Sequence, residues 1–278
     1  MYISGSYFKS HCRYRIGDYL DARNPVPSFI VSEDHDNNYV FCKTEFLARL
    51  FDLSESLPSK FVLLTHNSDI NICKDLSDHV LDEFPQISLW YAQNMMCHNP
   101  KIRPLPIGLA NPKWEHGNTD RFTRIISDGI SKEEKVYINF NVQTNEAHRS
   151  YCLNQIGAVI DTKYPHYPDA EIHNRFTRET QDKYLADMAK AFFVVSPFGN
   201  GVDCHKTWEA LYMRSIPIVI KTPMSEAFKA MDIPLVLLDD WADYKNLDLS
   251  STLYNNIWGK FDCRSFGFDK FISVEERI

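Results

Sequence analysis

Short apolar runs alternate with longer amphipathic segments along most of the chain, which is the pattern typical of βαβ units. The apolar runs of the first half are rich in β-branched and aromatic residues and predict strands at Ser28–Ser32, Tyr39–Cys42, Phe61–Thr65, Ile87–Tyr91 and Ile102–Pro106. The amphipathic segments between them predict helices at Glu45–Asp52, Asp75–Glu83 and Arg121–Asp128.

The same alternation restarts in the second half of the chain. It predicts strands at Val136–Phe140, Ala158–Asp161, Phe192–Ser196, Pro217–Ile220 and Pro234–Leu238. It predicts helices at Glu146–Gln155, Glu179–Lys190, Asp203–Arg214 and Glu226–Met231. Near-continuous apolar strands of this kind suit parallel sheets that are covered by helices on both faces.

A polar stretch, Asn118–Lys135, separates the two series and predicts a domain boundary. We therefore expect an α/β protein with two Rossmann-like lobes, residues 1–130 and residues 131–278, each built on a parallel sheet. Ligands bind at the carboxyl ends of parallel strands, so a cleft between the lobes is the expected binding site. The aromatic tail, 251–278, is expected to pack on the globule or back across the lobes.

Composition and charge exclude several classes of protein. The 278 residues include 30 Lys and Arg against 37 Asp and Glu, without a basic run, so we expect no nucleic-acid partner. The seven cysteines are scattered and form no C-x-x-C pair, as is usual for core thiols in a reducing compartment. Without a signal-peptide pattern, a sequon or an apolar stretch of membrane length, the expectation is a cytoplasmic protein with no integral membrane segment.

The most informative segment runs from Phe192 to Pro223, FFVVSPFGNGVDCHKTWEALYMRSIPIVIKTP. An apolar strand ends at Ser196 and Pro197, and a loop with two glycines leads to a helix that we expect to begin near Asp203 as its N-cap. Glycines let backbone approach a ligand closely, and a helix N-terminus offers free N–H groups to an anion. The candidate phosphate-binding residues of this loop are Ser196, Pro197, Gly199, Asn200, Gly201 and Asp203.

Polar residues of the following helix extend this candidate site. His205 and Lys206 would add donors and positive charge, and Glu209 would accept hydroxyls of a ribose or a sugar. Asp203, Lys206 and Glu209 share one helix face because they lie three residues apart. An ordinary strand–loop–helix connection with a capped helix would give the same pattern, so the residues alone leave both interpretations open.

The arrangement F-x-x-S-P-x-G-x-x-x-D-x-x-K-x-x-E-A-L-x-x-x-x-I-P-I-V over Phe193–Val219 resembles the donor-site signature of exostosin-like glycosyltransferases. The resemblance implies a GT-B enzyme that holds a UDP-sugar mainly in its C-terminal lobe and inverts the anomeric centre without an obligatory metal or other cofactor. UDP-xylose is the first donor expected, with galactose and glucuronic acid as other sugars, and a glycan hydroxyl as acceptor. Lys206 departs from the family's arginine, and Ser215 from its usual glycine.

Further donor contacts are expected where the second half opens, VYINFNVQTNEAHR. A strand ends near Asn141, and Thr144 or Asn145 would cap a helix that carries Arg149. In exostosin-like and fucosyltransferase-like sequences an arginine in this helix faces the donor, which implies that Arg149 neutralises the diphosphate, with Asn141 and Thr144 nearby. A surface arginine is the alternative interpretation.

An inverting transfer needs a base near the acceptor hydroxyl. The predicted strand Phe61–Thr65 is followed by His66, Asn67, Ser68 and Asp69, which makes Asp69 the first candidate base and His66 the second. The alternative is that both only support the turn. Amides after neighbouring strands suit sugar recognition or turn formation, and the candidate acceptor residues are Asn67, Gln93 and Asn94.

Two other functions remain possible from the sequence. The same fold would serve a non-catalytic protein that binds nucleotide sugars or glycans. Asp34-His35-Asp36 has the D-x-D form that metal-dependent GT-A transferases use, although its acidic, Asn-rich surroundings favour a solvated loop. No metal site is expected, because no His cluster has metal-ligand spacing.

Overall fold

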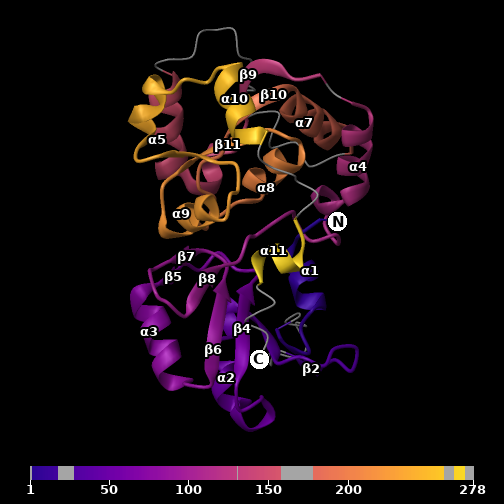
Figure 1. Ribbon diagram of the computed structural model, residues 1–278, viewed down its shortest axis with the longest axis vertical. Coiled ribbons are helices and arrows are strands. Elements are labelled where there is room, and N and C mark those ends of the chain that lie inside the picture. The colour runs from indigo at the N-terminus through magenta and orange to yellow at the C-terminus, as the bar shows by residue number, and fades with distance from the viewer. Residues whose placement is uncertain (1, 18–27, 130, 158–177, 260–265, 273–278) are drawn as a thin grey trace. The chain divides into compact units, whose positions relative to one another are not determined.

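The computed structural model describes residues 2–17, 28–129, 131–157, 178–259 and 266–272 (Figure 1). Contacts divide the chain into two compact units, Met1–Ile107 with Ser265–Ile278, and Gly108–Arg264. The predicted strand Ala158–Asp161 and parts of the 251–278 tail lie outside the described residues. Each described unit is an α/β layer structure, and its sheet is compatible with a Rossmann-like arrangement.

The first unit has a six-stranded mixed sheet in the order β2-β1-β3-β4-β6-β8. Its strands are β1 (Tyr14–Ile16), β2 (Phe29–Val31), β3 (Tyr39–Lys43), β4 (Phe61–His66), β6 (Ile87–Ala92) and β8 (Ile102–Pro104). Every neighbouring pair is parallel except β1 and β2. All residues of β4 are buried, as its unbroken apolar sequence requires of a central strand, whereas β2 forms the exposed edge.

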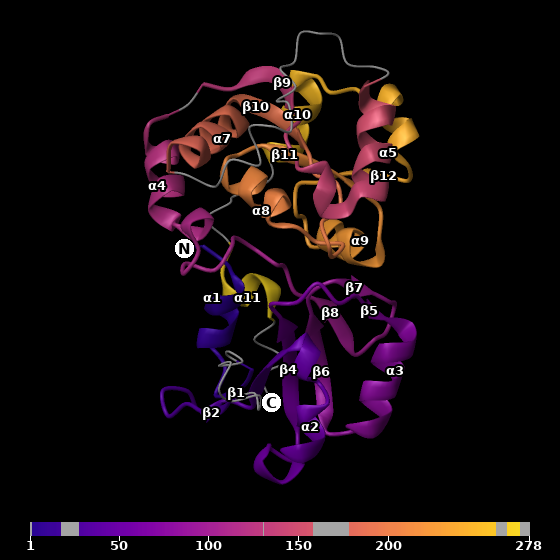
Figure 2. The ribbon, with the colours of Figure 1, turned by 180° about the vertical axis from the view of Figure 1, so that it is seen from behind.

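Short helices and a small ladder complete the first unit. They are α1 (Gly5–Ser10), α2 (Arg49–Asp52), α3 (Lys74–Glu83), α11 (Phe268–Phe271), the 3₁₀ turns η1 (Thr44–Phe46) and η2 (Ser54–Ser56), and the parallel pair β5 (Ile72–Cys73) and β7 (Met95–Met96). Phe8 of α1 and Phe271 of α11 meet edge to face at 6.3 Å, and Figures 1 and 2 both show these helices side by side. The C-terminal segment therefore belongs to the core of the first unit.

The second unit has a four-stranded parallel sheet in the order β12-β11-β10-β9. Its strands are β9 (Glu133–Tyr137), β10 (Ala191–Val195), β11 (Ile216–Ile220) and β12 (Val236–Leu238). Its helices and turns are η3 (Glu115–Gly117), α4 (Thr119–Ser127), η4 (Val142–Asn145), α5 (Glu146–Gly157), α7 (Arg178–Lys190), α8 (His205–Tyr212), α9 (Pro223–Ala230), η5 (Trp241–Asn246) and α10 (Ser251–Trp258).

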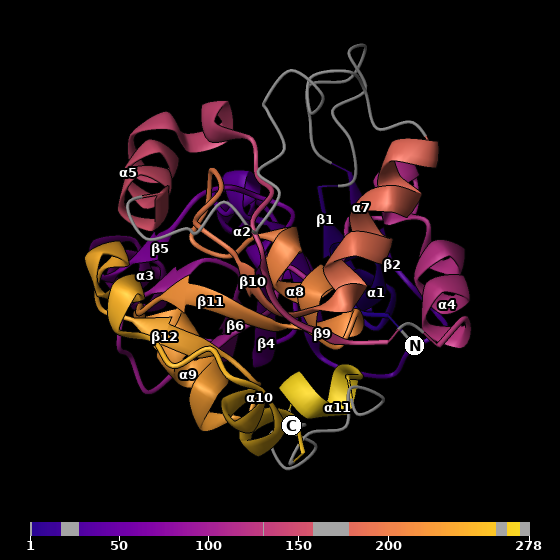
Figure 3. The same cartoon turned by 90° about the horizontal axis from the view of Figure 1, so that it is seen from above.

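Helices cover the second sheet as its apolar strands predict. Side chains of α5, η5 and α10 share one hydrophobic core with Phe193 and Val195 of β10. Val194, which points to the opposite face of β10, is also buried. Helix α7 contacts β9 and β10, and helix α8 contacts β11 (Figure 3). The carboxyl ends of β9 and β10 therefore lie next to the loops that precede α5 and α8.

The units part at Ile107, ahead of the expected boundary at residue 130. Helix α4 contacts α7 of the second unit through Arg124, which pairs with Asp182 at 2.6 Å, and it contacts α8 through Phe122, which packs against Tyr212. The polar segment Asn118–Lys135 thus contains an integral helix of the second unit. Its charged residues pair with α7 instead of forming a linker, which composition alone does not reveal.

Most predicted elements are confirmed to within about two residues, and three differ more, one of them α9, which begins at Pro223 and not at Glu226. The predicted helix Glu45–Asp52 is instead the 3₁₀ turn η1 followed by the one-turn helix α2, and neither has a side-chain cap. The predicted strand Val136–Phe140 lies three residues earlier, at β9, because its pairing with β10 begins at Glu133. Among the described residues, no helix has the length and apolar character needed to cross a membrane.

Candidate functional site

The connection from β10 to α8 has the strand–loop–helix form that the sequence predicts. Ser196 ends the strand, and its Oγ lies 2.9 Å from Thr207 Oγ1 and 3.2 Å from Cys204 Sγ. These contacts tie the first residue of the loop to the first turn of α8. The loop backbone is thereby held at the carboxyl end of the sheet, at the N-terminus of a helix.

Helix α8 begins at His205 with Cys204 as its N-cap, so the prediction that Asp203 is the N-cap is wrong. Both carboxylate oxygens of Asp203 instead accept from Trp208 Nε1 at 3.0 Å, and both side chains are buried. The Cys204 side chain accepts no hydrogen bond from a backbone N–H of the helix. The backbone N–H groups of His205 and Lys206 are consequently left without an intrahelical acceptor, as at any uncapped N-terminus.

Arg149 reaches the same loop from α5, although only 7% of it is exposed. Its Nε donates to the carbonyl of Phe198 at 2.7 Å, and its Nη1 donates to the carbonyl of Asn141 at 2.6 Å. Burial lowers the pKa of the guanidinium, although it stays positively charged. Within the described part of the chain no carboxylate pairs with Arg149 and no acceptor takes its Nη2.

Gly199 lies next to the unused edge of this guanidinium. A Cβ at Gly199 would stand 3.6 Å from Arg149 Nη2, in ordinary van der Waals contact. Asn145 Nδ2 donates to the Gly199 carbonyl at 2.8 Å, which fixes the loop against η4. The absence of a side chain at Gly199 therefore leaves Nη2 uncovered from the loop side.

Lys206 and Glu209 are joined through Tyr184 of α7. Lys206 Nζ donates to the Tyr184 hydroxyl at 2.7 Å, and that hydroxyl donates to Glu209 Oε2 at 2.7 Å. The ammonium also lies 4.5 Å from the centre of the Tyr184 ring, a cation–π contact. Burial lowers the pKa of Lys206 to about 8, with Glu209 acting in the opposite direction.

Glu209 is only 6% exposed, yet one of its oxygens stays unused. Its Oε2 accepts from Tyr184, and no described residue donates to Oε1. Oε1 is not among the fully buried side-chain atoms that lack a partner in the described residues, so water or a ligand can reach it and supply a donor. Ligand hydroxyls are suitable donors.

Two tyrosines that sequence reasoning missed complete this side of the site. Tyr184 and Tyr137 of β9 have ring centroids 6.0 Å apart, and Asn139 Nδ2 donates to the Tyr137 hydroxyl at 2.8 Å. Tyr184 precedes the signature segment and is separated from Lys206 by 22 positions, so no local pattern connects them. Only the packing of α7 against α8 brings the hydroxyl between Lys206 and Glu209.

Two histidines are also close to this part of the second unit. His205 Nδ1 lies 2.8 Å from the carbonyl of Gly108. His116 of η3 is partly buried, and burial lowers its pKa, while Glu209 acts to raise it and His205 to lower it. These couplings place His116 in the electrostatic surroundings of the cluster, a position that its sequence context did not indicate.

We call Arg149, Lys206 and the N-terminus of α8 the cation cluster. Among the described residues, no acceptor takes Arg149 Nη2, the remaining protons of Lys206 Nζ or the first backbone N–H groups of the helix. The chemistry of the cluster suits an anion with several oxygens, and phosphate or diphosphate has this form. The vacant oxygen of Glu209 would take a hydroxyl of the same ligand.

The chain matches no protein-family model and no curated protein.

The remaining predicted donor residues lie around the cluster in different ways. Pro197 and Gly201 are buried loop residues, whereas Asn200 is exposed. Asn141 contributes its carbonyl to Arg149, while its side chain caps η4 by accepting from Gln143. Thr144 is exposed, without a side-chain hydrogen bond to any described residue.

Ser215 stands where the exostosin-like signature usually has glycine, and the structure shows what its hydroxyl does. Its hydroxyl is buried and lies 2.8 Å from the carbonyls of Met188 and Ala191. It also accepts from Lys132 Nζ at 2.8 Å, and the same ammonium donates to the carbonyls of Ala191 and Met213. Ser215 thus belongs to a hydrogen-bond network at the amino end of the sheet, away from the loops at the carboxyl end.

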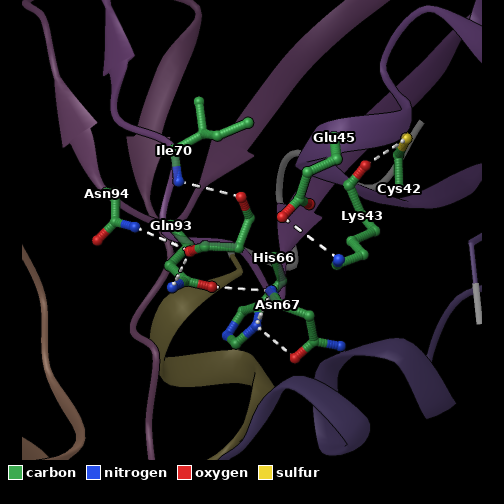
Figure 4. Close-up of polar contacts among 9 residues, drawn as sticks. Cys42, Lys43, Glu45, His66, Asn67, Ile70, Gln93 and Asn94 are labelled. Carbon is green, nitrogen blue, oxygen red and sulfur yellow. Dashed lines mark hydrogen bonds and ion pairs between the residues drawn. The ribbon is translucent and has the colours of Figure 1, made fainter. Parts of the chain in front are cut away.

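In the first unit, His66 lies at the end of β4 with 1% exposure (Figure 4). Its Nδ1 accepts from the backbone N–H of Asn67 at 2.7 Å, and its Nε2 lies 3.0 Å from the carbonyl of Pro106. These bonds place the ring proton on Nε2 and occupy both nitrogens. His66 therefore supports the turn in this conformation, which leaves Asp69 as the stronger candidate for a base.

The predicted acceptor residues also hold this turn, as Figure 4 shows. Gln93 accepts from the Asn67 backbone at 2.8 Å and donates to the Ser68 carbonyl at 2.8 Å. Asn94 donates to the same carbonyl at 3.0 Å. Gln93 and Asn94 are buried, so their amides maintain the loop, whereas Asp69 on that loop is exposed.

The three residues of the D-x-D sequence are hydrogen-bonded to other residues of the first unit. Asp36 pairs with Arg13 at 2.8 Å, and Asp34 accepts from Ser32 at 3.2 Å. His35 Nε2 lies 2.6 Å from the Ser10 carbonyl. Over the residues that the structure describes, no group of three or more His, Cys, Asp or Glu is arranged to hold a metal ion.

Proposed function

We propose that this chain is an inverting glycosyltransferase of the GT-B type that moves a sugar from a UDP-sugar, with UDP-xylose as the first candidate, to a hydroxyl of a glycan acceptor. One observation supports it above all others. Within the described part of the chain, Arg149 and Lys206 are cations with unused donors beside a helix N-terminus that no side chain caps, and Glu209 on the same helix has an oxygen without a donor. A diphosphate joined to a polyhydroxylated ring complements both features.

The cluster would contribute to catalysis by stabilising the leaving group. As the bond between the anomeric carbon and the diphosphate oxygen breaks, negative charge grows on that oxygen. Arg149 Nη2, Lys206 Nζ and the α8 N–H groups would donate to the diphosphate and lower the barrier, because their positions are already fixed before reaction. Glu209 would accept hydrogen bonds from hydroxyls of the ribose or the sugar and so hold the donor in the orientation that the reaction needs.

On the acceptor side, Asp69 would take the proton from the attacking hydroxyl. The new bond forms at the anomeric carbon as the bond to the diphosphate breaks, so the configuration inverts and UDP leaves. Asp69→Asn should abolish turnover while UDP binding to the second unit stays unchanged. Full turnover in this variant would remove Asp69 from the mechanism.

The direct test is a thermal-shift screen with UDP, GDP and a panel of nucleotide sugars, because ligands that prefer the folded state raise the midpoint. UDP and at least one UDP-sugar should raise it in the natural protein and not in Arg149→Met. Arg124→Met is the matched control, since it removes an exposed arginine of the same unit. Equal responses from the natural protein and Arg149→Met would contradict the proposal.

A non-catalytic nucleotide-sugar-binding protein is the second candidate function. The observation that favours it is the occupation of both ring nitrogens of His66, which leaves the first unit with a single exposed candidate base. Ligand binding without sugar transfer to any glycan acceptor would support this alternative. Transfer that stops with EDTA and returns with Mn²⁺ would instead indicate a metal-dependent transferase.

A further inference from the structure

Lys206 and Glu209 carry opposite charges on the same face of α8, yet they form no direct ion pair among the described contacts. Residues three apart on a helix are neighbours, and a lysine and a glutamate at this spacing normally attract each other. Here the hydroxyl of Tyr184 lies between them, 2.7 Å from Lys206 Nζ and 2.7 Å from Glu209 Oε2. The two charges are linked through a neutral group.

This separation has a chemical consequence. A direct pair would direct the ammonium at the carboxylate, and both groups would then be partly withdrawn from a ligand. With the hydroxyl in between, two N–H donors of Lys206 and Oε1 of Glu209 are left without a hydrogen-bond partner among the residues that the structure describes. The ring of Tyr184 also fixes the ammonium, because Nζ lies 4.5 Å from the ring centre.

We propose that Tyr184 is a positioning residue that keeps Lys206 and Glu209 apart, so that the ammonium binds a phosphate group and the carboxylate binds ligand hydroxyls. This inference rests on the proposed function of the same site. The hydroxyl donates to Glu209 and accepts from Lys206, a direction fixed by its single proton and by the lack of an acceptor on an ammonium group.

The charges around these residues agree with this role. Lys206 faces Tyr184 of α7, Glu209 and Cys204 of its own helix region, and Arg149 of α5. Burial is the main cause that lowers its pKa to about 8, and Arg149 adds to this, while Glu209 and Cys204 oppose it. Burial, followed by Glu209, raises the pKa of Tyr184 well above its ordinary value, so the hydroxyl remains a neutral donor.

The test compares Tyr184→Phe with the natural protein. Phenylalanine keeps the ring against Lys206 and Tyr137 but removes the hydroxyl, so Lys206 and Glu209 are expected to pair directly. Two quantities are measured: the pH dependence of Lys206 acetylation by competitive labelling and mass spectrometry, and the affinity for inorganic pyrophosphate. The titration of Lys206 should move to higher pH, and pyrophosphate should bind about tenfold more weakly, as expected when one charged donor is withdrawn.

A second substitution separates positioning from general damage. In the double variant Tyr184→Phe, Glu209→Gln, the Glu209 carboxylate is no longer there to pair with Lys206. The titration of Lys206 should therefore move back to lower pH, and the affinity for pyrophosphate should return towards that of the natural protein. Pyrophosphate has no sugar hydroxyls, so loss of the Glu209 carboxylate should not itself weaken binding. Tyr254→Phe is the control, because it removes a tyrosine hydroxyl bond to the Arg214 carbonyl outside the cluster.

Each outcome decides one question. If Tyr184→Phe leaves both the Lys206 titration and pyrophosphate affinity unchanged, or if the double variant binds as weakly as the single one, the positioning role is wrong. If the natural protein binds neither pyrophosphate nor any nucleotide, the proposed function fails. The shift of the Lys206 titration in Tyr184→Phe would still establish that the hydroxyl separates the two charges.

Discussion

The indole of Trp241 donates from Nε1 to Nε2 of His148 at 3.2 Å, and this bond places the proton of the neutral imidazole on Nδ1. The same imidazole stacks on Phe198, with ring centroids 4.4 Å apart. Phe198 is the residue whose carbonyl accepts from Arg149. The protonation state of His148 is thus linked to the loop that orients the guanidinium.

This linkage predicts a loss of stability in mild acid. Burial and the neighbouring Arg149 lower the pKa of His148 below 6.5, while Asp240 opposes them. Below pH 6.5 the unfolded chain therefore binds more protons at this residue, so the stabilisation is full above that pH and is lost as pH falls through it. Urea midpoints of the natural protein from about pH 8 to about pH 5 should decrease.

His148→Phe should flatten this decrease. The variant keeps the stacking on Phe198 but cannot titrate, and it costs about 1–3 kcal/mol at neutral pH because the Trp241 N–H loses its acceptor. His116 also has a lowered pKa, so some decrease with acid should remain in the variant. Identical pH profiles for the two proteins would show that His148 does not contribute.

Gly199→Ala should weaken ligand binding without harming the fold. Its Cβ would lie 3.6 Å from Arg149 Nη2 and 3.7 Å from Cys204 Cβ, so it fits without displacement but covers the vacant donors. We expect stability within about 0.5 kcal/mol of the natural protein. Isothermal titration with UDP should give an affinity about tenfold lower, since one charged hydrogen bond is obstructed.

Gly157→Ala is the matched control for this experiment, because a Cβ there would meet no atom within 4 Å. It should leave UDP affinity unchanged. If Gly199→Ala binds UDP as tightly as Gly157→Ala does, the guanidinium edge beside the loop is not part of the ligand site.

Asp203→Ala should destabilise the second unit. Removal of the carboxylate leaves the buried Trp208 N–H without the acceptor it uses, which costs about 1–3 kcal/mol. Asp203→Asn keeps an acceptor oxygen and should cost less. Urea denaturation measures both, with the exposed Asp248→Ala as control, and an undiminished midpoint in Asp203→Ala would disprove this role.

Asn94 should respond to substitution through its backbone as well as its side chain. Its φ is +56°, in the left-handed region, and its amide donates to the Ser68 carbonyl. Both variants lose the side-chain hydrogen bond to Ser68, and Asn94→Ala also adds backbone strain of about 1–2 kcal/mol. Asn94→Ala should therefore be the less stable variant in urea denaturation, and equal stabilities would contradict the strain.

Most strands of the two large sheets were predictable because short apolar runs mark the buried strands, whereas β1 (Tyr14–Ile16), with Arg15 at its centre, was not predicted. The strand–loop–helix connection was also predictable, since Ser196, Gly199 and the helix after them are close in sequence. Asp203 was misassigned as an N-cap because its partner, Trp208, lies inside the helix that it was expected to cap. Local pattern cannot distinguish a capping carboxylate from one that binds a buried indole.

The residues that sequence reasoning missed depend on contacts between distant segments. Tyr184 reaches Lys206 only because α7 packs on α8, and His116 approaches Glu209 only through the fold of the second unit. Gln93 and Asn94 resembled recognition residues because they follow a strand. Their amides are instead bonded to the turn at His66–Ser68, which no spacing in the sequence indicates.

The most direct measurement of the central claim is a crystal structure of the protein with UDP bound. The account predicts that the diphosphate oxygens lie within hydrogen-bond distance of Arg149 Nη2 and Lys206 Nζ at the start of α8, with a ribose or sugar hydroxyl at Glu209. UDP bound at another place, with the cation cluster empty, would contradict it.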